Sequence, residues 1–182
     1  SDLKAAARIA ADIGEQTLRV MRDGEASGGF HPIRESDLFD MEYWSLEQAK
    51  LGKGKPAALQ GRIVLVTGAA GAIGAAIARA FAAQGASLML IDREAEAVEA
   101  LRASLGRDHC ALACDITAAG AADQAIGACI DSFGGLDILI SNAGAAMTGD
   151  MASLPDTTLR ASFELNFFAP VAFAQAAARV LS

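Results

Sequence analysis

The chain has 182 residues, which suffices for one domain of ordinary size or for one domain with part of another. Its formal net charge of −7 and its pI of about 4.8 argue against a broad nucleic-acid surface, which needs clustered lysine and arginine. Apolar residues make up 53% of the chain, ample for a buried core, yet neither a membrane span nor a signal peptide is evident.

The three cysteines, Cys110, Cys114 and Cys129, are an odd and sparse set that does not suggest a disulfide framework. Free cysteines are usually small core residues, so we expect that role here rather than a metal site. Neither His31 nor His109 has a partner at a spacing typical of metal ligands. No metal is therefore predicted, and a reducing, cytoplasmic setting is favoured.

Residues 1–51 predict a small helical segment. Apolar residues recur at helical spacing over residues 5–21, and the turns Asp23-Gly24 and Ser27-Gly28-Gly29 are expected to end that helix. The capping-box pattern Ser45-Leu46-Glu47-Gln48 predicts a second, short helix to about Leu51. The segment has too few elements to fold by itself, and residues 52–60 form a predicted linker.

Residues 61–182 alternate between predicted strands and helices. Strands are expected at about 63–67, 87–91, 110–114 and 136–141, and helices at about 72–84, 94–105, 118–133 and from 156 onward. Several of the strands are continuous apolar runs, as sheets covered on both faces require. The expected fold is therefore α/β: a Rossmann-like, doubly wound parallel sheet of about four strands, preceded by the small helical segment.

The turn between the first strand and its helix carries the strongest functional signal. An apolar strand leads into Thr67-Gly68-Ala69-Ala70-Gly71-Ala72-Ile73-Gly74 and then into an alanine-rich helix. Such a layout is typical of a dinucleotide phosphate site, where glycines permit a tight turn and close approach, and the helix N-terminus attracts an anion. The predicted cofactor-binding residues of this turn are Gly68, Ala70, Gly71, Ala72, Ile73 and Gly74.

The second predicted strand ends at Asp92, where a dinucleotide site places an acidic residue to accept the ribose hydroxyls. This carboxylate would repel a 2′-phosphate, so NAD is expected and NADP is less favoured. The neighbouring Arg93 acts in the opposite sense, because a guanidinium could accept that phosphate. Asp92 could also be a helix N-cap, and the two roles are compatible.

Three motifs, at the ends of the first, third and fourth predicted strands, make residues 61–182 resemble the short-chain dehydrogenase/reductase superfamily. They are the glycine turn, Cys114-Asp115-Ile116-Thr117 and Ser141-Asn142-Ala143-Gly144. The resemblance implies that Asp115 bonds the adenine amine, that Ile116 lies against the ring, and that Asn142, Ala143 and Gly144 lie beside the nicotinamide ribose. Asn166 matches the helix asparagine that helps hold a proton-relay water. The glycine spacing also suits the extended branch of this superfamily.

A second resemblance lies upstream. The stretch Asp37 to Leu51 is similar to the junction of bifunctional class II aldolase/short-chain dehydrogenases of the rhamnulose-phosphate aldolase/alcohol dehydrogenase type. It implies that residues 1–51 are the end of an aldolase-like domain and that the substrate is a small, sugar-derived molecule. For Tyr43 and Trp44, simple packing of a connecting helix is favoured over catalysis.

The resembled family also implies a catalytic Ser, a Tyr and a Lys four residues after it, and these have no counterpart here. Tyr43 is the sole tyrosine, and no lysine follows Lys55. The expectation is thus the cofactor-binding half of an oxidoreductase, a fragment inactive alone; the alternative is a non-catalytic dinucleotide-binding or scaffold module. The apolar positions Leu159, Phe163, Phe167 and Val171 could be core or the contact of a homo-oligomer.

Overall fold

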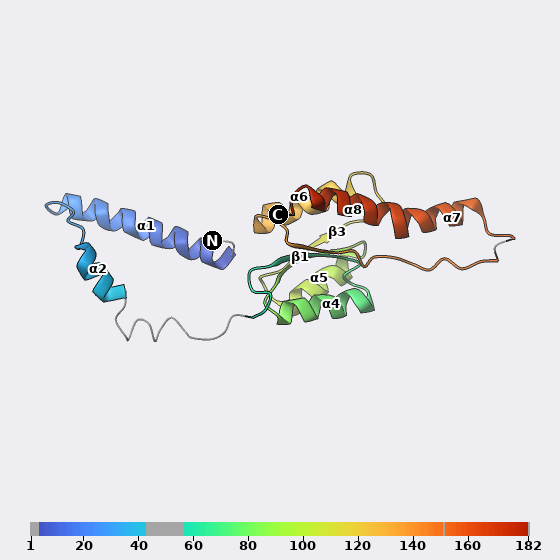
Figure 1. Cartoon of the computed structure of the whole chain (residues 1–182), viewed down its shortest axis with the longest axis horizontal. Helices are drawn as coiled ribbons and strands as arrows, with labels where there is room; N and C mark the ends of the chain where they lie inside the picture. The colour runs from blue at the N-terminus through green and yellow to red at the C-terminus, as the bar shows by residue number, and fades with distance from the viewer. Residues whose placement is uncertain (1–3, 43–56, 151, 182) are drawn as a thin grey trace. The chain divides into compact units, whose positions relative to one another are not determined.

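The computed structural model describes residues 4–42, 57–150 and 152–181 (Figure 1). The chain divides into two compact units, Ser1–Pro56 and Ala57–Ser182. The second unit is an α/β fold and contains the predicted cofactor site. No helix within the described ranges combines the length and the apolar character needed to cross a membrane.

The first unit holds two helices, α1 (Lys4–Ala26) and α2 (Glu35–Glu42). The prediction that Asp23-Gly24 ends α1 was wrong, because the helix continues through Gly24. It ends where Ser27 N–H bonds the Asp23 and Gly24 carbonyls and Gly28 adopts φ 127°. Helix α2 was not predicted, since it has no marked apolar period; its acidic first turn was the available signal. The helix predicted from Ser45 lies outside the described residues.

The second unit alternates strands and helices as expected, and its four strands are all parallel in the order β3-β2-β1-β4. The strand order reverses beside β1, since β2 and β3 lie on one side of it and β4 on the other. In chain order the elements are β1 Ile63–Thr67, α4 Ala72–Ala83, β2 Ser87–Asp92, α5 Ala95–Leu105, β3 Cys110–Ala113, α6 Ala121–Phe133, β4 Ile138–Ile140, α7 Asp156–Phe163, η1 Glu164–Phe168 and α8 Ala169–Ala178.

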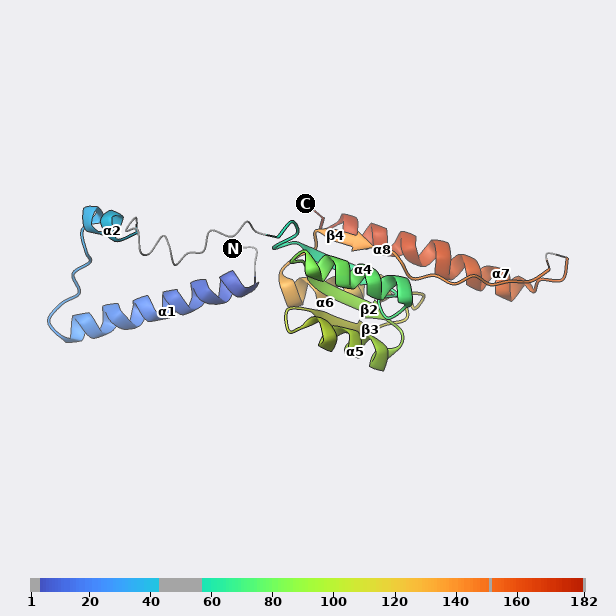
Figure 2. The same ribbon diagram turned by 90° about the horizontal axis from the view of Figure 1, so that it is seen from below.

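Alternate residues of each central strand point to opposite faces of the sheet, and each face has its own core. Val64 and Leu88 pack with α4 and α5, whereas Leu65 and Met89 pack with α6 and α8. Figures 1 and 2 show these helix pairs on the two faces. The continuous apolar strands predicted from the sequence are thus buried on both sides, as the doubly wound fold requires.

The largest differences from the predicted elements are in β4, in α6 and in the last helix. Strand β4 is shorter than expected at both ends; just before it, the Asp137 carboxylate accepts the Ile63 N–H at 2.8 Å and pairs with Arg62. Helix α6 begins at Ala121, after Gly120 in the left-handed conformation. The last predicted helix is interrupted by η1, a π-helical turn in which the Ala169 N–H bonds the Glu164 carbonyl five residues back. Pro170 follows, and it has no N–H for the usual bond to Asn166.

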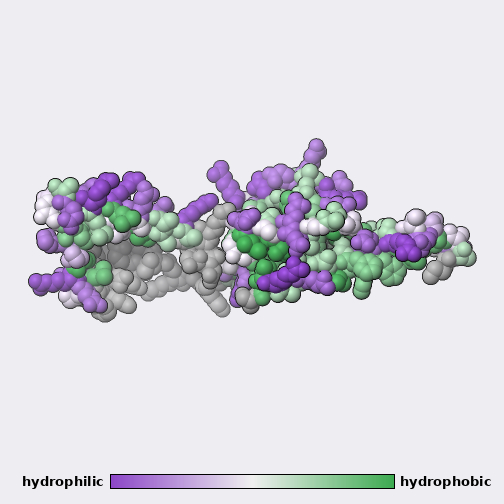
Figure 3. Space-filling view, turned by 90° about the horizontal axis from the view of Figure 1, so that it is seen from above, coloured by the Kyte–Doolittle hydropathy of each residue, from purple (hydrophilic) through white to green (hydrophobic). Residues whose placement is uncertain are grey.

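A stripe of apolar side chains on α7, η1 and α8 is exposed. It comprises Leu159, Phe163, Phe167 and Val171, with Phe168 beside it. Figure 3 shows green, apolar surface along this part of the molecule. The buried side of α8, which includes Phe173, packs on the sheet and α6 instead. The stripe is therefore no part of the core formed by the described residues.

The side chain of His109, the residue just before β3, forms an additional hydrogen bond to β2. It is buried, and its Nδ1 accepts a hydrogen bond from the Leu88 N–H at 3.2 Å. Burial lowers the pKa of this imidazole below its usual 6.5; Asp108 and the Leu105 carbonyl act in the opposite sense, and Arg102 lowers it slightly. Protonation of Nδ1 would remove the acceptor that the Leu88 N–H uses.

We expect the protein to lose stability as the pH falls below about 6.5, the ordinary histidine pKa in an unfolded chain. Because the pKa is lower in the folded state, the unfolded state binds more protons below that pH, and stability declines toward acid. Urea denaturation from about pH 8 to about pH 5 should show a steeper decline for the wild type than for His109→Asn, whose amide oxygen accepts without titrating. The exposed His31→Asn is the control and should keep the wild-type slope; equal slopes in all three proteins would contradict the prediction.

Candidate functional site

The glycine-rich turn connects β1 to α4 and folds tightly against its surroundings. Gly68 has φ +63°, and a Cβ there would lie 2.8 Å from the Ala143 Cα. The Gly71 N–H bonds the Gly68 carbonyl at 3.2 Å. Gly74 packs so closely on this carbonyl that a Cβ would overlap its oxygen. The turn therefore needs glycine at 68 for its backbone conformation and at 74 for close approach.

The N-terminus of α4 is open to a ligand. Gly71 caps it with φ −66° and ψ 161°, no side chain caps the helix, and no acidic residue stands in its first turn. A Cβ at Gly71 would contact only the Gly68 carbonyl oxygen, at 3.4 Å. Ala72 and Ile73 begin the helix, and Ile73 is 71% exposed. The free N–H groups and the positive end of the helix dipole can thus bind an anion such as a pyrophosphate.

Asp92 ends β2 beside this turn. Its Oδ2 accepts the Ala70 N–H at 2.9 Å, and its Oδ1 accepts the Glu94 N–H at 3.2 Å. The N-cap role considered for Asp92 was wrong, because the residue that caps α5 is Glu94. The two backbone bonds use part of the carboxylate's capacity of about four acceptor positions, so it can also accept ribose hydroxyls.

Arg93 and Asp115 lie at the same edge of the sheet. Arg93 is exposed and its Nε pairs with the Glu94 carboxylate at 3.2 Å. Asp115 Oδ1 accepts the N–H and the hydroxyl of Thr117, at 2.9 and 2.7 Å. The N–H bond is the main reason why the pKa of Asp115 is lowered, with the hydroxyl second and Arg93 a weaker contribution. Asp115 is therefore ionised at neutral pH and suited to accept hydrogen bonds from a ligand.

The loop after β4 is held to the end of β1 by hydrogen bonds, centred on the buried Thr67. Thr67 is 1% exposed, and its hydroxyl oxygen accepts the N–H groups of Asn142 and Ala143, each at 3.1 Å. The Asn142 side chain donates to the carbonyls of Thr67 and Gly68, at 3.0 and 3.1 Å. These bonds fix Asn142, Ala143 and Gly144 beside the glycine-rich turn. The sequence did not single out Thr67, although a threonine ending an apolar strand was the available signal.

Asn166 connects the π-helical turn η1 to the same loop. Its Oδ1 accepts the Ala145 N–H at 3.1 Å, and its Nδ2 donates to the carbonyls of Ala145 and Ser162, each at 2.9 Å. A Cβ at Gly144 would lie 2.8 Å from Asn166 Oδ1. Asn166 therefore holds one wall of the site in place and lies beside the cavity, not in its lining.

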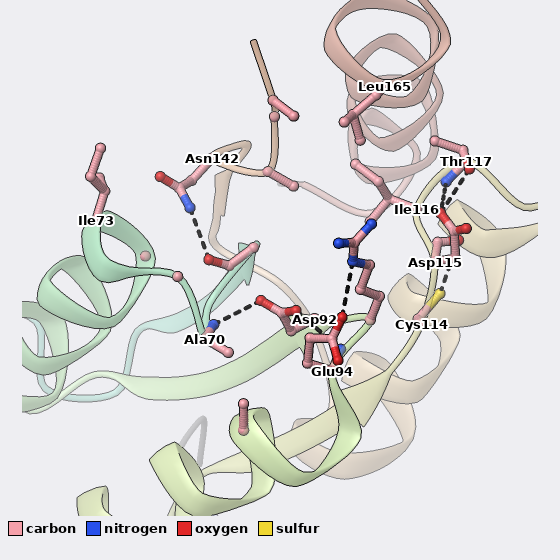
Figure 4. Close-up of a pocket in the computed structure, with 18 of the residues that line it drawn as sticks. Ala70, Ile73, Asp92, Glu94, Cys114, Asp115, Ile116, Thr117, Asn142 and Leu165 are labelled. Atoms are coloured by element: carbon pink, nitrogen blue, oxygen red, sulfur yellow. Dashed lines mark hydrogen bonds and ion pairs between the residues drawn. The ribbon is translucent and has the colours of Figure 1, made fainter. Parts of the chain in front are cut away.

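These elements surround one cavity of about 790 Å³ at the carboxyl ends of the strands (Figure 4). Every cofactor-binding residue predicted from the sequence lines it: Gly68, Ala70, Gly71, Ala72, Ile73, Gly74, Asp92, Arg93, Asp115, Ile116, Asn142, Ala143 and Gly144. The structure adds lining residues that the sequence did not indicate, including Met147, Ala161, Glu164 and Leu165. These come from the loop after β4 and from α7 and η1, which the motifs do not cover.

The cysteines lie in or beside the cores and not in a reactive cluster. Cys114 and Cys129 are buried and Cys110 is half-buried, and all three are free thiols. Burial raises the pKa of Cys114 and raises that of Cys129 to about 12, so neither is a thiolate at neutral pH. In the part of the chain that the structure describes, no three His, Cys, Asp or Glu side chains are grouped to hold a metal ion.

Comparison with protein families gives two matches. Residues 62–182 match the short chain dehydrogenase family. Residues 1–51 match the second domain of class II aldolases. The first match covers the whole α/β part of the chain, and the second covers the predicted helical segment.

Similar proteins include D-threitol dehydrogenase of Mycolicibacterium smegmatis, 47% identical over 91 residues, which are 48% of this chain and 35% of that protein. The uncharacterized oxidoreductase YuxG of Bacillus subtilis is 29% identical over 163 residues, 85% of this chain and 24% of that protein. A solved short chain dehydrogenase from Burkholderia cenocepacia, in complex with NADP, is 38% identical with a TM-score of 0.65 and covers 68% of this chain and 52% of that one. The chain therefore spans between a quarter and about half of these proteins.

Proposed function

The chain belongs to the short-chain dehydrogenase family, and we propose that it binds NAD for an oxidoreductase acting on a small, sugar-derived alcohol or carbonyl compound. The observation that carries the proposal is the cavity at the carboxyl ends of the strands. It combines a glycine-rich turn, an open helix N-terminus and an acidic residue at the end of β2.

The cavity fits a nicotinamide dinucleotide, which when bound supplies or accepts a hydride. The N–H groups at the start of α4 would bind the pyrophosphate, which the absent side chain at Gly71 lets approach closely. Asp92 would accept hydrogen bonds from the ribose hydroxyls. Asp115 would accept a hydrogen bond from the adenine amine, and Ile116 would lie beside the ring. Asn142, Ala143 and Gly144 would lie along the nicotinamide ribose. For Asn166 we propose a share in holding a proton-relay water, through the loop that it fixes.

The preference for NAD over NADP rests on the charges at the end of β2. Asp92 and Glu94 both line the cavity there and would repel a 2′-phosphate. Arg93 is the neighbouring cation, and its guanidinium already pairs with Glu94. The NADP-bound Burkholderia structure shows that a similar protein takes the other cofactor, so the preference of this chain is a matter for direct measurement.

For the whole protein we propose an aldolase-like domain joined to the dehydrogenase. The match of residues 1–51 to a class II aldolase second domain supports this arrangement. So does YuxG, which aligns with most of this chain yet extends well beyond it. The D-threitol dehydrogenase relative supports a sugar-alcohol substrate. The homo-oligomer and the cytoplasmic location stay predictions, the former supported by the exposed stripe on α7 and α8.

These 182 residues by themselves are proposed to bind the cofactor without turning it over. Proton transfer to a carbonyl at neutral pH needs a group whose pKa is lowered by a neighbouring cation, such as a tyrosine near a lysine. Tyr43 is the sole tyrosine and precedes the α/β part, and no lysine follows Lys55. The alternative, a non-catalytic binding module, would have the same cavity, and the coding sequence after Ser182 distinguishes the two by the presence or absence of a Tyr-x-x-x-Lys motif.

Fluorescence titration with NADH and NADPH tests the proposal. We expect NADH to bind more tightly than NADPH, by roughly tenfold for the repulsion between the 2′-phosphate and the half-buried Asp92 carboxylate, and we expect no NADH to form with polyols. Arg93→Ala should lower the affinity for NADPH more than the affinity for NADH. The control Arg107→Ala removes an exposed arginine outside the cavity and should change neither affinity. Tighter binding of NADPH would overturn the cofactor assignment, and no binding of either would overturn the proposed function.

A further inference from the structure

Asp92 makes a contact that a ribose acceptor does not need. Its Oδ2 accepts the N–H of Ala70, in the middle of the glycine-rich turn, at 2.9 Å (Figure 4). The preceding N–H, that of Ala69, bonds the Ile91 carbonyl at 3.0 Å. Two successive N–H groups of the turn are thus bound by two successive residues at the end of β2. The carboxylate continues the β1–β2 ladder, whose last backbone pair is Thr67 and Ile91.

The carboxylate itself is held in the orientation that this contact requires. Its other oxygen accepts the Glu94 N–H at 3.2 Å, at the start of α5. Each carboxylate oxygen therefore accepts a hydrogen bond from a different loop, and the side chain is half-buried between the two loops. A hydrogen bond to a charged acceptor contributes roughly twice as much as a neutral one, so this contact is a substantial restraint on the turn.

We infer that Asp92 is a positioning residue: through the Ala70 N–H it fixes the turn that presents the first N–H groups of α4 to a phosphate. The inference rests on the proposed dinucleotide site and deepens it. Its consequence is that removal of the carboxylate weakens the binding of every such nucleotide, with or without ribose hydroxyls. A small neutral residue at 92 would make room for a 2′-phosphate, yet loss of the anchor would offset the affinity for NADP gained in this way.

The test compares ligands that differ only in the ribose hydroxyls. ADP and 2′,3′-dideoxyadenosine 5′-diphosphate are titrated against the wild-type 182-residue chain and its Asp92→Ala and Asp92→Asn variants. An Asp92 that served only as ribose acceptor would leave the affinity for the dideoxy compound unchanged on substitution. The positioning role predicts that Asp92→Ala also lowers the affinity for the dideoxy compound. The expected decrease is roughly tenfold, as for the loss of one charge-assisted hydrogen bond. Asp92→Asn, which keeps one oxygen, should lose less.

Amide hydrogen exchange provides a second readout that needs no ligand. The Ala70 amide should exchange at least about tenfold faster in Asp92→Ala, as its bond is lost. The Ala69 amide, bonded to a backbone carbonyl, should stay protected and so excludes general loosening of the fold. Glu96→Ala is the matched control, because it removes an exposed carboxylate four residues away that does not line the cavity.

Unchanged affinity for the dideoxy compound together with unchanged Ala70 exchange in Asp92→Ala would overturn the inference. Equal acceleration at Ala69 and Ala70 would also overturn it, since the effect would then be general. Failure of the wild type to bind either nucleotide would overturn the proposed function instead, and the exchange of Ala70 would still decide whether Asp92 anchors the turn.

Discussion

Gly74→Ala is expected to destabilise the protein strongly and to remove dinucleotide binding. The added Cβ would overlap the Gly68 carbonyl oxygen and lie 2.8 Å from Asn142 Nδ2. Both neighbours belong to the fixed junction between the glycine-rich turn and the loop after β4, so the turn itself has to move. We expect a loss of folding free energy at or above the upper end of the roughly 1–3 kcal/mol typical of overpacking. Urea denaturation and NADH titration measure the two effects.

Gly71→Ala is the matched control in the same turn. Its backbone angles suit alanine, and its nearest neighbour would be the Gly68 carbonyl oxygen at 3.4 Å. Stability should change by no more than about 0.5 kcal/mol, as for a substitution away from tight packing. Dinucleotide affinity should still fall, because the new methyl group stands where a pyrophosphate would approach. Equal destabilisation by the two substitutions would contradict the division of roles between these glycines.

Thr67→Val is expected to destabilise the junction between β1 and β4. Valine keeps the shape of threonine but cannot accept the N–H groups of Asn142 and Ala143, which both bind the Thr67 hydroxyl. Each unpaired buried donor costs roughly 1–3 kcal/mol, and we expect the lower part of that range because this loop is only half-buried. Since the same loop lines the cavity, NADH affinity should fall together with stability.

Thr67→Ser separates the hydroxyl from the methyl group at this position. Serine keeps the acceptor, so the loop should stay in place and NADH affinity should remain close to that of the wild type. The loss of one buried methyl group should cost about 1 kcal/mol. If serine and valine weakened NADH binding equally, packing and not hydrogen bonding would hold the loop.

The predicted sheet and its cavity followed from patterns local to the chain. Continuous apolar strands that alternate with helices require a parallel sheet, and the carboxyl ends of parallel strands share one edge. Hence the residues after β1, β2, β3 and β4 were expected together, and they line one cavity. Helix α2 was missed because it has no clear periodic signal, whereas Ser27-Gly28-Gly29, one of the two predicted stop signals, does follow the end of α1 at Ala26.

The sequence by itself determined the fold class, the family resemblance and the motif residues that line the cavity, because periodicity and motif spacing are properties of neighbouring residues. Only the tertiary structure decided what individual side chains do there. The bond from Ala70 to Asp92 joins residues 22 apart, and the bonds from Asn142 and Ala143 to Thr67 join residues 75 and 76 apart. The overlap that requires glycine at 74, and not at 71, likewise depends on how the turn folds back on itself. Such contacts depend on distances and angles between segments brought together by packing, which spacing along the chain does not specify.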